Sequence, residues 1–461
     1  MKIVNKTLWV FVATITFMVA ALEATPTKTG GFGLYNPATN FNESWMIDGQ
    51  LPYIDINPAS MGALNPQLYG DTDGANQNEG GIMFKPVSNL FVGVFIGKPA
   101  YTSHLNAISG DFSPYYTILG TINPAGSFMV ADPVLGTNNA PALNTRNISA
   151  IFQMSMGNMN LGLGLNYART SRFIETIITL PASTNTSSKI NSNLGIVLGA
   201  DIKTGNMNID ASVAYKNSGI NNSVKLAASK EEITLADKGL KDLNADVRIS
   251  TKLGGNNLLH GAIGFSLTGG SAEYKYTNTT AGALVKNATL TSDSGGMDIK
   301  LGVSDEMRID EKLMSFFGLV YNRTSKTIAN ITGTINGTTT PAAGNSSSTD
   351  TIGNVVTLIL GLEANLSENW MGRFGIGSNI WNNTPKTITT TKTTASTTTV
   401  TDSTFNDAGS NIAFGLSYKL SNFSLDWNIN KALLVNGPNF IGGTMPGMAA
   451  SFGVNYAFDK K

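Results

Sequence analysis

Alternation of large apolar residues with small or polar ones is the feature that most restricts how this chain can fold. In the last segment, Phe452, Val454, Tyr456 and Phe458 are each separated by one small or polar residue. A period of two places all four large side chains on one face of a β-strand. Because the same pattern recurs along most of the chain, the sequence predicts an all-β protein.

Seven pairs of alternating segments precede this last strand, and each pair is joined by a short turn. Short turns make the two strands of a pair antiparallel neighbours. The pairs are 82–85 with 90–96, 148–156 with 161–167, 194–198 with 207–215, 247–253 with 259–267, 297–303 with 313–321, 356–362 with 374–376, and 412–418 with 425–429.

The N-terminus indicates where this β-protein goes. Residues 1–24 have the layout of a secretory signal peptide, with Lys2 and Lys6 before an apolar run, and cleavage after Ala21 or after Ala24 is compatible with it. No later stretch approaches the ~18–20 consecutive apolar residues of a spanning helix. A mature chain in a membrane would therefore have to be a closed β-barrel, and we expect it in the bacterial outer membrane.

Strand parity refines this expectation. Bacterial barrels have an even number of strands, short periplasmic turns and long extracellular loops. Seven hairpins and a terminal strand need one further strand before residue 81, for which 51–55 or 54–56 is a source. We expect a transmembrane antiparallel up-and-down β-barrel of about 14–16 strands.

Composition excludes several classes of function. The 31 basic and 31 acidic residues balance, which leaves no basic footprint for nucleic acid. The chain has no cysteine, so thiol catalysis and Cys-ligated metals are excluded, and we expect neither a cofactor nor a metal site. The two histidines, His104 and His260, come without a recognisable nucleophile motif, so we expect no enzyme activity.

If the apolar face of each strand meets lipid, the residues between face the lumen. Charged residues at these positions are mixed in sign, so they either line an aqueous pathway or pair across the wall. Besides His260, the lumen-lining candidates are Asp201, Asp210, Asp246, Arg248, Lys252, Asp298, Lys300, Glu363, Arg373, Lys419 and Asp426.

Aromatic residues fall at two levels, one strand length apart, as in the interfacial girdles of membrane barrels. Such girdles imply contact with outer-membrane lipid. The outer level contains Tyr167, Tyr215, Tyr321 and Trp381, and the level near the short turns contains Trp370, Tyr418, Tyr456 and Phe458.

The export signal, the hairpins and the terminal strand together resemble those of Gram-negative outer-membrane β-barrels. The strand 452–458 is similar to the sorting signal that the barrel assembly machinery reads, which implies this machinery as a partner. In typical members the last aromatic is the final residue, whereas residues 459–461 follow it here.

A narrower resemblance concerns the segment Asn57-Pro58-Ala59-Ser60-Met61. It is similar to the Asn-Pro-Ala segment of the FadL-type transporters of hydrophobic compounds, in which it lies near an N-terminal hatch inside the barrel. The resemblance implies that Asn57, Pro58 and Ala59 belong to a hatch. Residues 25–80 would then be partly a plug, and the first strand would lie elsewhere than at 51–56.

These expectations divide the chain into a signal peptide, 1–24, an N-terminal segment with a plug and first strand, 25–80, and the barrel, 81–461. The leading hypothesis is a porin-like channel for passive passage of small solutes. The alternatives are a FadL-like transporter of hydrophobic compounds and a surface-exposed adhesin or structural barrel. We also expect the segment 98–147 to fold into the lumen or cap it; the sequence leaves the substrate and the oligomeric state open.

Overall fold

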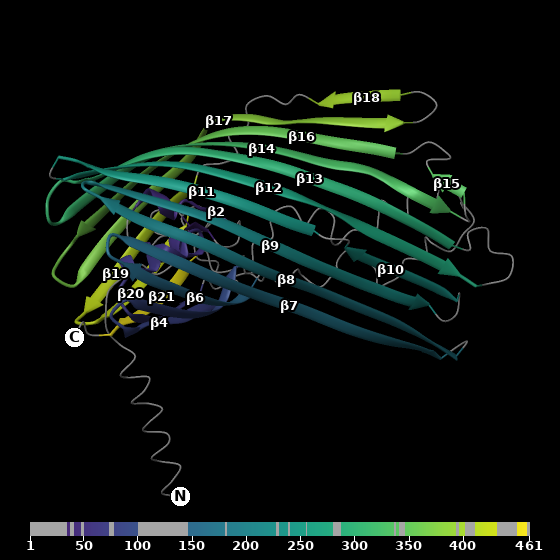
Figure 1. Ribbon diagram of the computed structural model, residues 1–461, viewed down its shortest axis with the longest axis horizontal. Helices are drawn as coiled ribbons and strands as arrows, with labels where there is room; N and C mark the ends of the chain where they lie inside the picture. Colours follow the sequence, from purple (N-terminus) through teal and green to yellow (C-terminus); the bar gives the residue numbers. More distant parts are fainter. Residues whose placement is uncertain are drawn as a thin grey trace, which may run out of the picture.

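A computed structural model shows the chain folded as a closed antiparallel β-barrel (Figure 1). The predicted signal peptide and residues 100–145 lie outside the described residues. Among the described residues, no helix is long and apolar enough to cross a membrane. The structure describes residues 35–36, 41–47, 50–72, 78–99, 146–179, 182–226, 230–237, 240–254, 256–279, 287–335, 338–340, 346–392, 396–401, 411–430 and 450–458, and residue 50 forms a single bridge.

Sixteen of the described strands form the wall, in agreement with the expected fold. They are β3 (Gln67–Thr72), β4 (Asn78–Val87), β5 (Leu90–Pro99), β6 (Arg146–Met156), β7 (Met159–Thr179), β8 (Ala182–Thr204), β9 (Met207–Leu226), β11 (Leu240–Leu253), β12 (Asn257–Asn278), β13 (Asn287–Arg308), β14 (Leu313–Ile335), β16 (Ser346–Asn365), β17 (Trp370–Lys392), β19 (Asn411–Leu420), β20 (Phe423–Asn430) and β21 (Ala450–Ala457).

The remaining elements are short. Strands β10 (Glu231–Asp237), β15 (Thr338–Thr340) and β18 (Ser396–Thr401) extend the wall, and β1 (Tyr35–Asn36) pairs with β2 (Phe41–Asn42). Three 3₁₀ helices follow: η1 (Ser44–Met46), η2 (Leu51–Asp55) and η3 (Pro58–Ala63).

The barrel closes where the C-terminal strand β21 pairs with β3, placing Tyr456 opposite Leu68. The first wall strand is therefore Gln67–Thr72, and the suggestion that 51–55 or 54–56 supplies it is wrong. Those residues form η2 because Pro52 stands at its start, and because Leu51 and Ile54, three residues apart, share one face of a 3₁₀ helix.

The short turns lie where the sequence predicts them. Gly157, between β6 and β7, has φ +63°, and Gly205, between β8 and β9, has φ +58°. A positive φ at the first turn residue suits the right-handed twist of the flanking strands and strains a residue with a Cβ. These glycines thereby hold the hairpins in the register on which the two faces of the wall depend.

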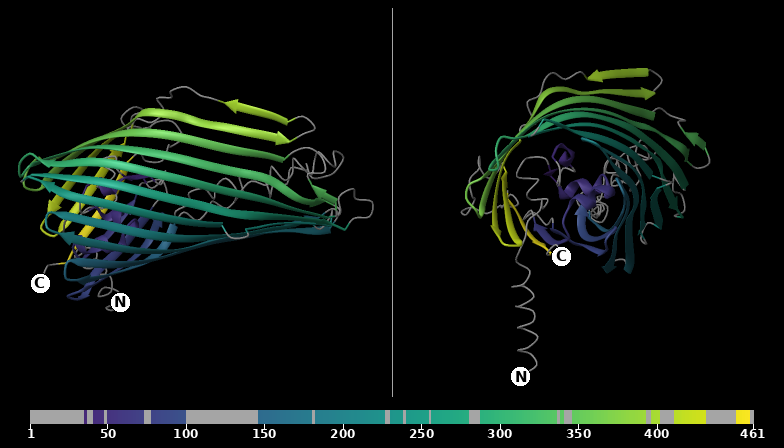
Figure 2. Two further views of the ribbon diagram at one scale, coloured as in Figure 1. Left: turned by 45° about the horizontal axis from the view of Figure 1, so that its top comes forward. Right: turned by 60° about the vertical axis from the view of Figure 1, so that its left-hand side comes forward.

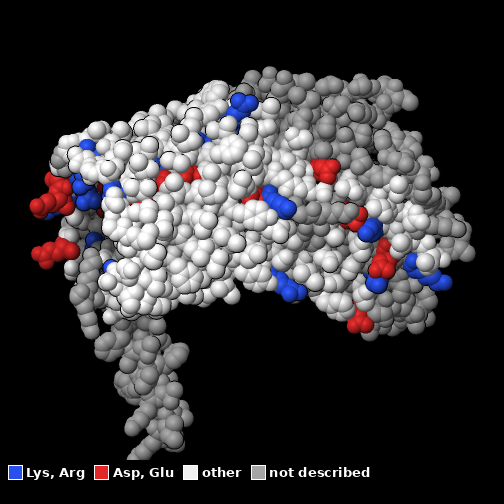
Figure 3. All heavy atoms as spheres, viewed as in Figure 1, with Lys and Arg blue, Asp and Glu red and all other residues white. Residues whose placement is uncertain are grey.

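The two faces of the wall differ as the alternation predicts. Outward side chains are apolar and exposed, for example Ile148 at 62%, Leu198 at 58% and Ile263 at 59% exposure. On the face shown in Figure 3 the surface is largely uncharged over a broad band, whereas charged residues gather at the short-turn end and on the outer half. A closed wall with an apolar outer band is the arrangement that can cross a bilayer with strands.

The wall is much taller on one side than on the other (Figures 1 and 2). Strand β7 has 21 residues, whereas β20 and β21 have eight each. Because a tilted strand needs about 9–11 residues to cross a membrane, β7 continues beyond it. Much of 169–193, 216–243 and 268–295, which lie between the predicted hairpins, is described as continued strand.

We predict that Leu163→Arg, in the apolar band of β7, destabilises the barrel by about 2–4 kcal/mol, since a charge at the bilayer midplane is costly. Urea unfolding in lipid vesicles measures this. Phe173→Arg is the matched control, because Phe173 is outward on the same strand, beyond Arg169, and 66% exposed. Equal losses for the two variants would contradict the assigned band.

Candidate functional site: a hatch inside the barrel

The N-terminal segment lies inside the ring of strands at its short-turn end (Figure 2). We call residues 41–47 and 50–66 the hatch; they include η1, η2 and η3. The hatch is compact, because the backbone amide of Asn57 donates to the carbonyl of Tyr53 at 2.9 Å and that of Leu64 donates to Met61 at 3.0 Å. It contacts the wall through two apolar clusters and several polar bonds.

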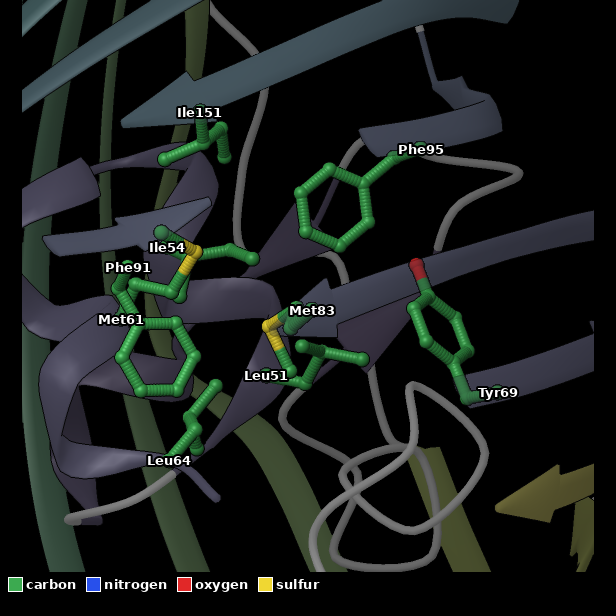
Figure 4. Packing of buried hydrophobic residues seen from close by; sticks show 9 residues of the cluster. All are labelled: Leu51, Ile54, Met61, Leu64, Tyr69, Met83, Phe91, Phe95 and Ile151. Atoms are coloured by element: carbon green, nitrogen blue, oxygen red, sulfur yellow. The ribbon is translucent and has the colours of Figure 1, made fainter. Parts of the chain in front are cut away.

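The first cluster joins the hatch to the short side of the wall, β3 to β6 (Figure 4). Phe95, on β5, is fully buried, and its ring centroid lies 6.2 Å from that of Tyr69 on β3. Phe95 fits because two wall residues near it, Gly81 and Gly93, have no Cβ. The cluster consists of Leu51, Ile54, Met61 and Leu64 from the hatch and Tyr69, Met83, Phe91, Phe95 and Ile151 from the wall.

The second cluster joins η1 and the start of η2 to the tall side of the wall. The indole of Trp45 lies over Gly302 of β13, and the sulfur of Met46 lies over Gly318 of β14, where a Cβ would overlap it. Its members are Trp45, Met46, Ile47 and Tyr53 from the hatch and Phe316, Val320 and Ile359 from the wall.

Arg248 of β11 links the wall to the hatch by polar contacts. Its Nε lies 2.7 Å from Asp210 Oδ2 on β9, and its Nη1 donates to the carbonyl of Trp45 at 3.1 Å. The guanidinium also lies 4.5 Å from the ring centroid of Tyr53. A buried ion pair offsets its desolvation only when such further contacts satisfy the charged groups.

Glu43 forms a second polar attachment, from the hatch to β13. Its carboxylate accepts from the indole Nε1 of Trp45 and lies 2.8 Å from the ammonium of Lys300. Nearby, Ser304 Oγ donates to the carbonyl of Met46 at 3.1 Å. The backbone ends of the short η1 helix thus find partners in the wall, as buried backbone groups require.

The segment Asn57-Pro58-Ala59 starts η3 and lies directly against β7 and β8. Asn57 accepts from the amide of Ala59 at 3.0 Å and donates to the carbonyl of Ala200 at 3.1 Å. A Cβ at Gly162 would overlap the backbone of Pro58 and Ala59, and one at Gly199 would overlap Asn57. These two wall glycines therefore form a seat for the segment, which we call the glycine seat.

Three of the seven lumen-lining candidates near the hatch are buried, and three of the seven form ion pairs. Asp201, Asp210 and Arg248 are buried, and Lys300 is bonded to Glu43, while Asp246 and Asp298 are half-buried and Lys252 is exposed at the short-turn end. That these residues line a conducted pathway stays a prediction.

Across the barrel, three of the other candidates, Glu363, Arg373 and Asp426, form a network. The Nε of Arg373 lies 2.7 Å from Glu363 Oε2, and its Nη1 lies 3.6 Å from Asp426 Oδ1, with Ser417 hydrogen-bonded to both Arg373 and Asp426. Lys419 is half-buried. These contacts favour ion pairs between neighbouring strands over solvated charges that line an aqueous pathway.

The predicted girdle residues all point away from the lumen. Tyr167, Tyr215 and Trp381 are 42–48% exposed, and Tyr321 donates to Asn354 at 2.9 Å. At the short-turn end the rings cluster, with Trp370 4.8 Å from Tyr418 and Tyr456 5.4 Å from Phe458 between centroids. Their depth in the bilayer stays a prediction.

The closed wall, the apolar outer band and the charged residues on the inner face of the wall decide the class of protein. The chain is an outer-membrane β-barrel. The hatch agrees with the resemblance to FadL-type transporters, because Asn57, Pro58 and Ala59 belong to a segment packed inside the wall.

Comparisons with known proteins show similarity of architecture. No family model and no curated relative matches the sequence. The toluene transporter TodX of Pseudomonas putida is 10% identical, with 95% of this chain and 97% of that chain covered and a TM-score of 0.38. A FadL homologue of Pseudomonas aeruginosa is 10% identical, with 96% and 100% covered and a TM-score of 0.41.

The ferric yersiniabactin receptor FyuA of Yersinia pestis is 9% identical, with 79% of this chain and 60% of that chain covered, at a TM-score of 0.42. Scores this low do not separate one barrel function from another. The function therefore has to be argued from the site itself.

A cavity of about 540 Å³ lies between the hatch and the short-turn ends of β8, β9, β11, β12 and β13. It is lined by hatch residues such as Tyr53 and Leu64 and by the polar wall residues Asp201, Asn208 and Ser250. Among the described residues, no group of three or more acidic or histidine side chains is arranged to hold a metal ion.

Sequence reasoning missed several residues of this site. Gly162 and Gly199 carry no signal of their own in a glycine-rich chain, and Glu43 and Trp45 lie in a segment without periodicity. Ser250 Oγ lies 2.7 Å from His260 Nδ1, in a buried pair that links β11 to β12. Alternation places His260 on the lumen face but does not indicate Ser250 as its partner.

We predict that Gly162→Ala displaces the hatch, since the new methyl group would overlap Pro58 and Ala59; overpacking of this kind costs about 1–3 kcal/mol. Limited proteolysis of the purified barrel, followed by mass spectrometry of hatch peptides, measures the release. Gly164→Ala is the control, because its Cβ would lie 3.4 Å from Val197 Cβ, an ordinary contact. Identical cleavage in both variants would refute the glycine seat.

Proposed function

We propose that this barrel transports hydrophobic compounds across the outer membrane, with the hatch closing its periplasmic end. The observation that supports this best is the apolar cluster between the hatch and β3–β6. An apolar ligand can replace apolar contacts between hatch and wall without leaving a buried polar group unpaired. A hydrated solute would break these apolar contacts and would offer no apolar surface in exchange.

The porin-like channel, the leading hypothesis from sequence, is less well supported. A porin keeps a water-filled lumen, and its lining charges are solvated. Here the hatch occupies part of the short-turn end, and Arg248 and Arg373, both buried, are held by ion pairs. An adhesin would bind its partner through the outer surface of the barrel. The hatch therefore neither supports nor contradicts that alternative.

We predict that the intact barrel conducts ions weakly in planar bilayers and that deleting residues 25–64 opens a steady conductance, since the lumen would lose its hatch. The deletion stops before Gln67 because β3 closes the barrel with β21. A deletion of 25–80 would remove a wall strand and could not separate gating from folding.

Uptake of a radiolabelled long-chain fatty acid and of toluene by a Gram-negative host lacking its own such transporter completes the test. Uptake of either compound above the empty-vector level is expected from the intact barrel. A large steady conductance of the intact barrel, without uptake of either compound, would show a porin instead.

A further inference from the structure

The cavity beneath the hatch has a charge distribution of its own, which the proposed transport of hydrophobic compounds does not use. Its inner part is acidic and rich in hydrogen-bond acceptors, and its rim is basic. We call these parts the floor and the rim. The floor contains Asp201 and the side-chain amide of Asn208, whose backbone is level with Lys203 in the pairing of β8 with β9, and the rim contains Lys203, Lys252 and Arg308.

The floor has acceptor atoms to which the described residues offer no donor. Asp201 is 4% exposed, and its Oδ2 accepts from Asn160 Nδ2 at 3.1 Å, whereas its Oδ1 is buried and has no hydrogen-bond partner. The side-chain oxygen Oδ1 of Asn208 is likewise buried and has no hydrogen-bond partner. Both residues line the cavity. A ligand that donates hydrogen bonds would satisfy both oxygens.

The floor also carries an excess of negative charge. Asp201 lies directly opposite Asp210 in the pairing of β8 with β9, where like charges destabilise a sheet. Arg248 lies opposite Asp210 on the other side and forms its ion pair with that carboxylate. Among the described residues that line the cavity, Arg248 is the one buried cation and Asp201 and Asp210 are two buried carboxylates, which favours a positively charged ligand group next to Asp201.

The rim of the cavity, in contrast to the floor, is positively charged. Lys203 follows Asp201 by two residues on β8, and Arg308 follows Glu306 by two residues on β13, so each pair shares the inward face. Lys203 and Lys252 are exposed, and the Arg308 side chain, 71% exposed, lies 3.5 Å from Glu306 Oε1 through its Nη2, which leaves its other guanidinium nitrogens for a ligand. Two residues along a strand span about 7 Å. A lone cation would therefore meet repulsion at the rim, and a lone anion would meet repulsion at the floor.

We propose that this cavity binds a small zwitterion. The ammonium group donates to Asp201 Oδ1 and Asn208 Oδ1, and the acidic group pairs with the exposed Lys203 and Lys252 and with Arg308. Free amino acids and the ethanolamine headgroup of a phospholipid share this chemistry. The site requires no transport of hydrophobic cargo, so the two proposals can fail separately.

Isothermal titration of the full barrel in maltoside detergent tests the site, with O-phosphoethanolamine and glycine as probes. Ethanolamine and inorganic phosphate serve as the matched half-molecules. We expect saturable binding of at least one zwitterion, about tenfold or more tighter than that of either half-molecule, because each charged hydrogen bond contributes. Tighter binding of O-phosphoethanolamine would indicate the phospholipid headgroup, and tighter binding of glycine would indicate a free amino acid.

Two variants test which cavity residue binds the ammonium group of the zwitterion and which binds its acidic group. Asp201→Asn should weaken zwitterion binding about tenfold or more, and Lys203→Met should weaken it through the acidic group. Lys203 is exposed at the rim, so its variant tests the site even if Asp201→Asn fails to fold, which heat-modifiable gel mobility reveals. Glu311→Gln, an exposed acid outside the cavity, should bind like the unaltered barrel.

The proposal is overturned if neither zwitterion binds saturably, or if a half-molecule binds as tightly as the zwitterions. Unchanged binding by folded Asp201→Asn, or stronger binding by Lys203→Met, would equally overturn it. The second result would mean that Lys203 competes for the carboxylate of Asp201 instead of holding the ligand.

Discussion

Pairing of β21 with β3 is the interaction on which the rest of the structure depends, because it turns an open sheet into a wall without edges. In a bilayer an unpaired edge would expose backbone amides and carbonyls to hydrocarbon, at a cost of several kcal/mol for each group. The closure is reinforced inside the lumen, where Asn455 Nδ2 donates to Gln67 Oε1 at 2.6 Å. It also fixes where the hatch ends and the wall begins.

Closure and alternation together explain why the fold was predictable from the sequence. Lipid outside and polar surroundings inside oblige every strand to keep a period of two, so segments such as 161–167 and 452–458 were placed with the correct face outward. Glycine turns such as Gly157 fixed the hairpins. The prediction of the first strand was wrong because this segment fits two patterns. Leu51 and Tyr53 are two residues apart, as on one face of a strand, and Leu51 and Ile54 are three apart, as on one face of a 3₁₀ helix. Only the packing of Leu51 and Ile54 against the wall decides between the two.

The site was less predictable than the fold, for a different reason. Alternation tells which residues face the lumen, but the partner of each lumen residue depends on the registers of several hairpins at once. Arg248 and Asp210 are adjacent only because β9 pairs with β11 in one register. The hatch contacts have no periodic signal at all, and the segment at Asn57 was found only through resemblance to a known family.

The hatch is held by contacts of two kinds, and their energies respond differently to a ligand. On the side of β9 to β13 it is bound by the hydrogen bond from Arg248 to the carbonyl of Trp45 and by the ion pair of Glu43 with Lys300, and a hydrogen bond to a charged group contributes about 1.5–3 kcal/mol. On the side of β3 to β6 it is held by apolar surface, at about 25 cal/mol per Å². A hydrophobic ligand can replace the apolar contacts between the hatch and β3 to β6, whereas it cannot replace the polar contacts of Arg248 and Glu43. Under the transport of hydrophobic compounds that we propose, the side of Arg248 and Glu43, which also holds the second apolar cluster, would stay attached, and the side lined by Phe91 and Phe95 is the one that we expect a ligand to open.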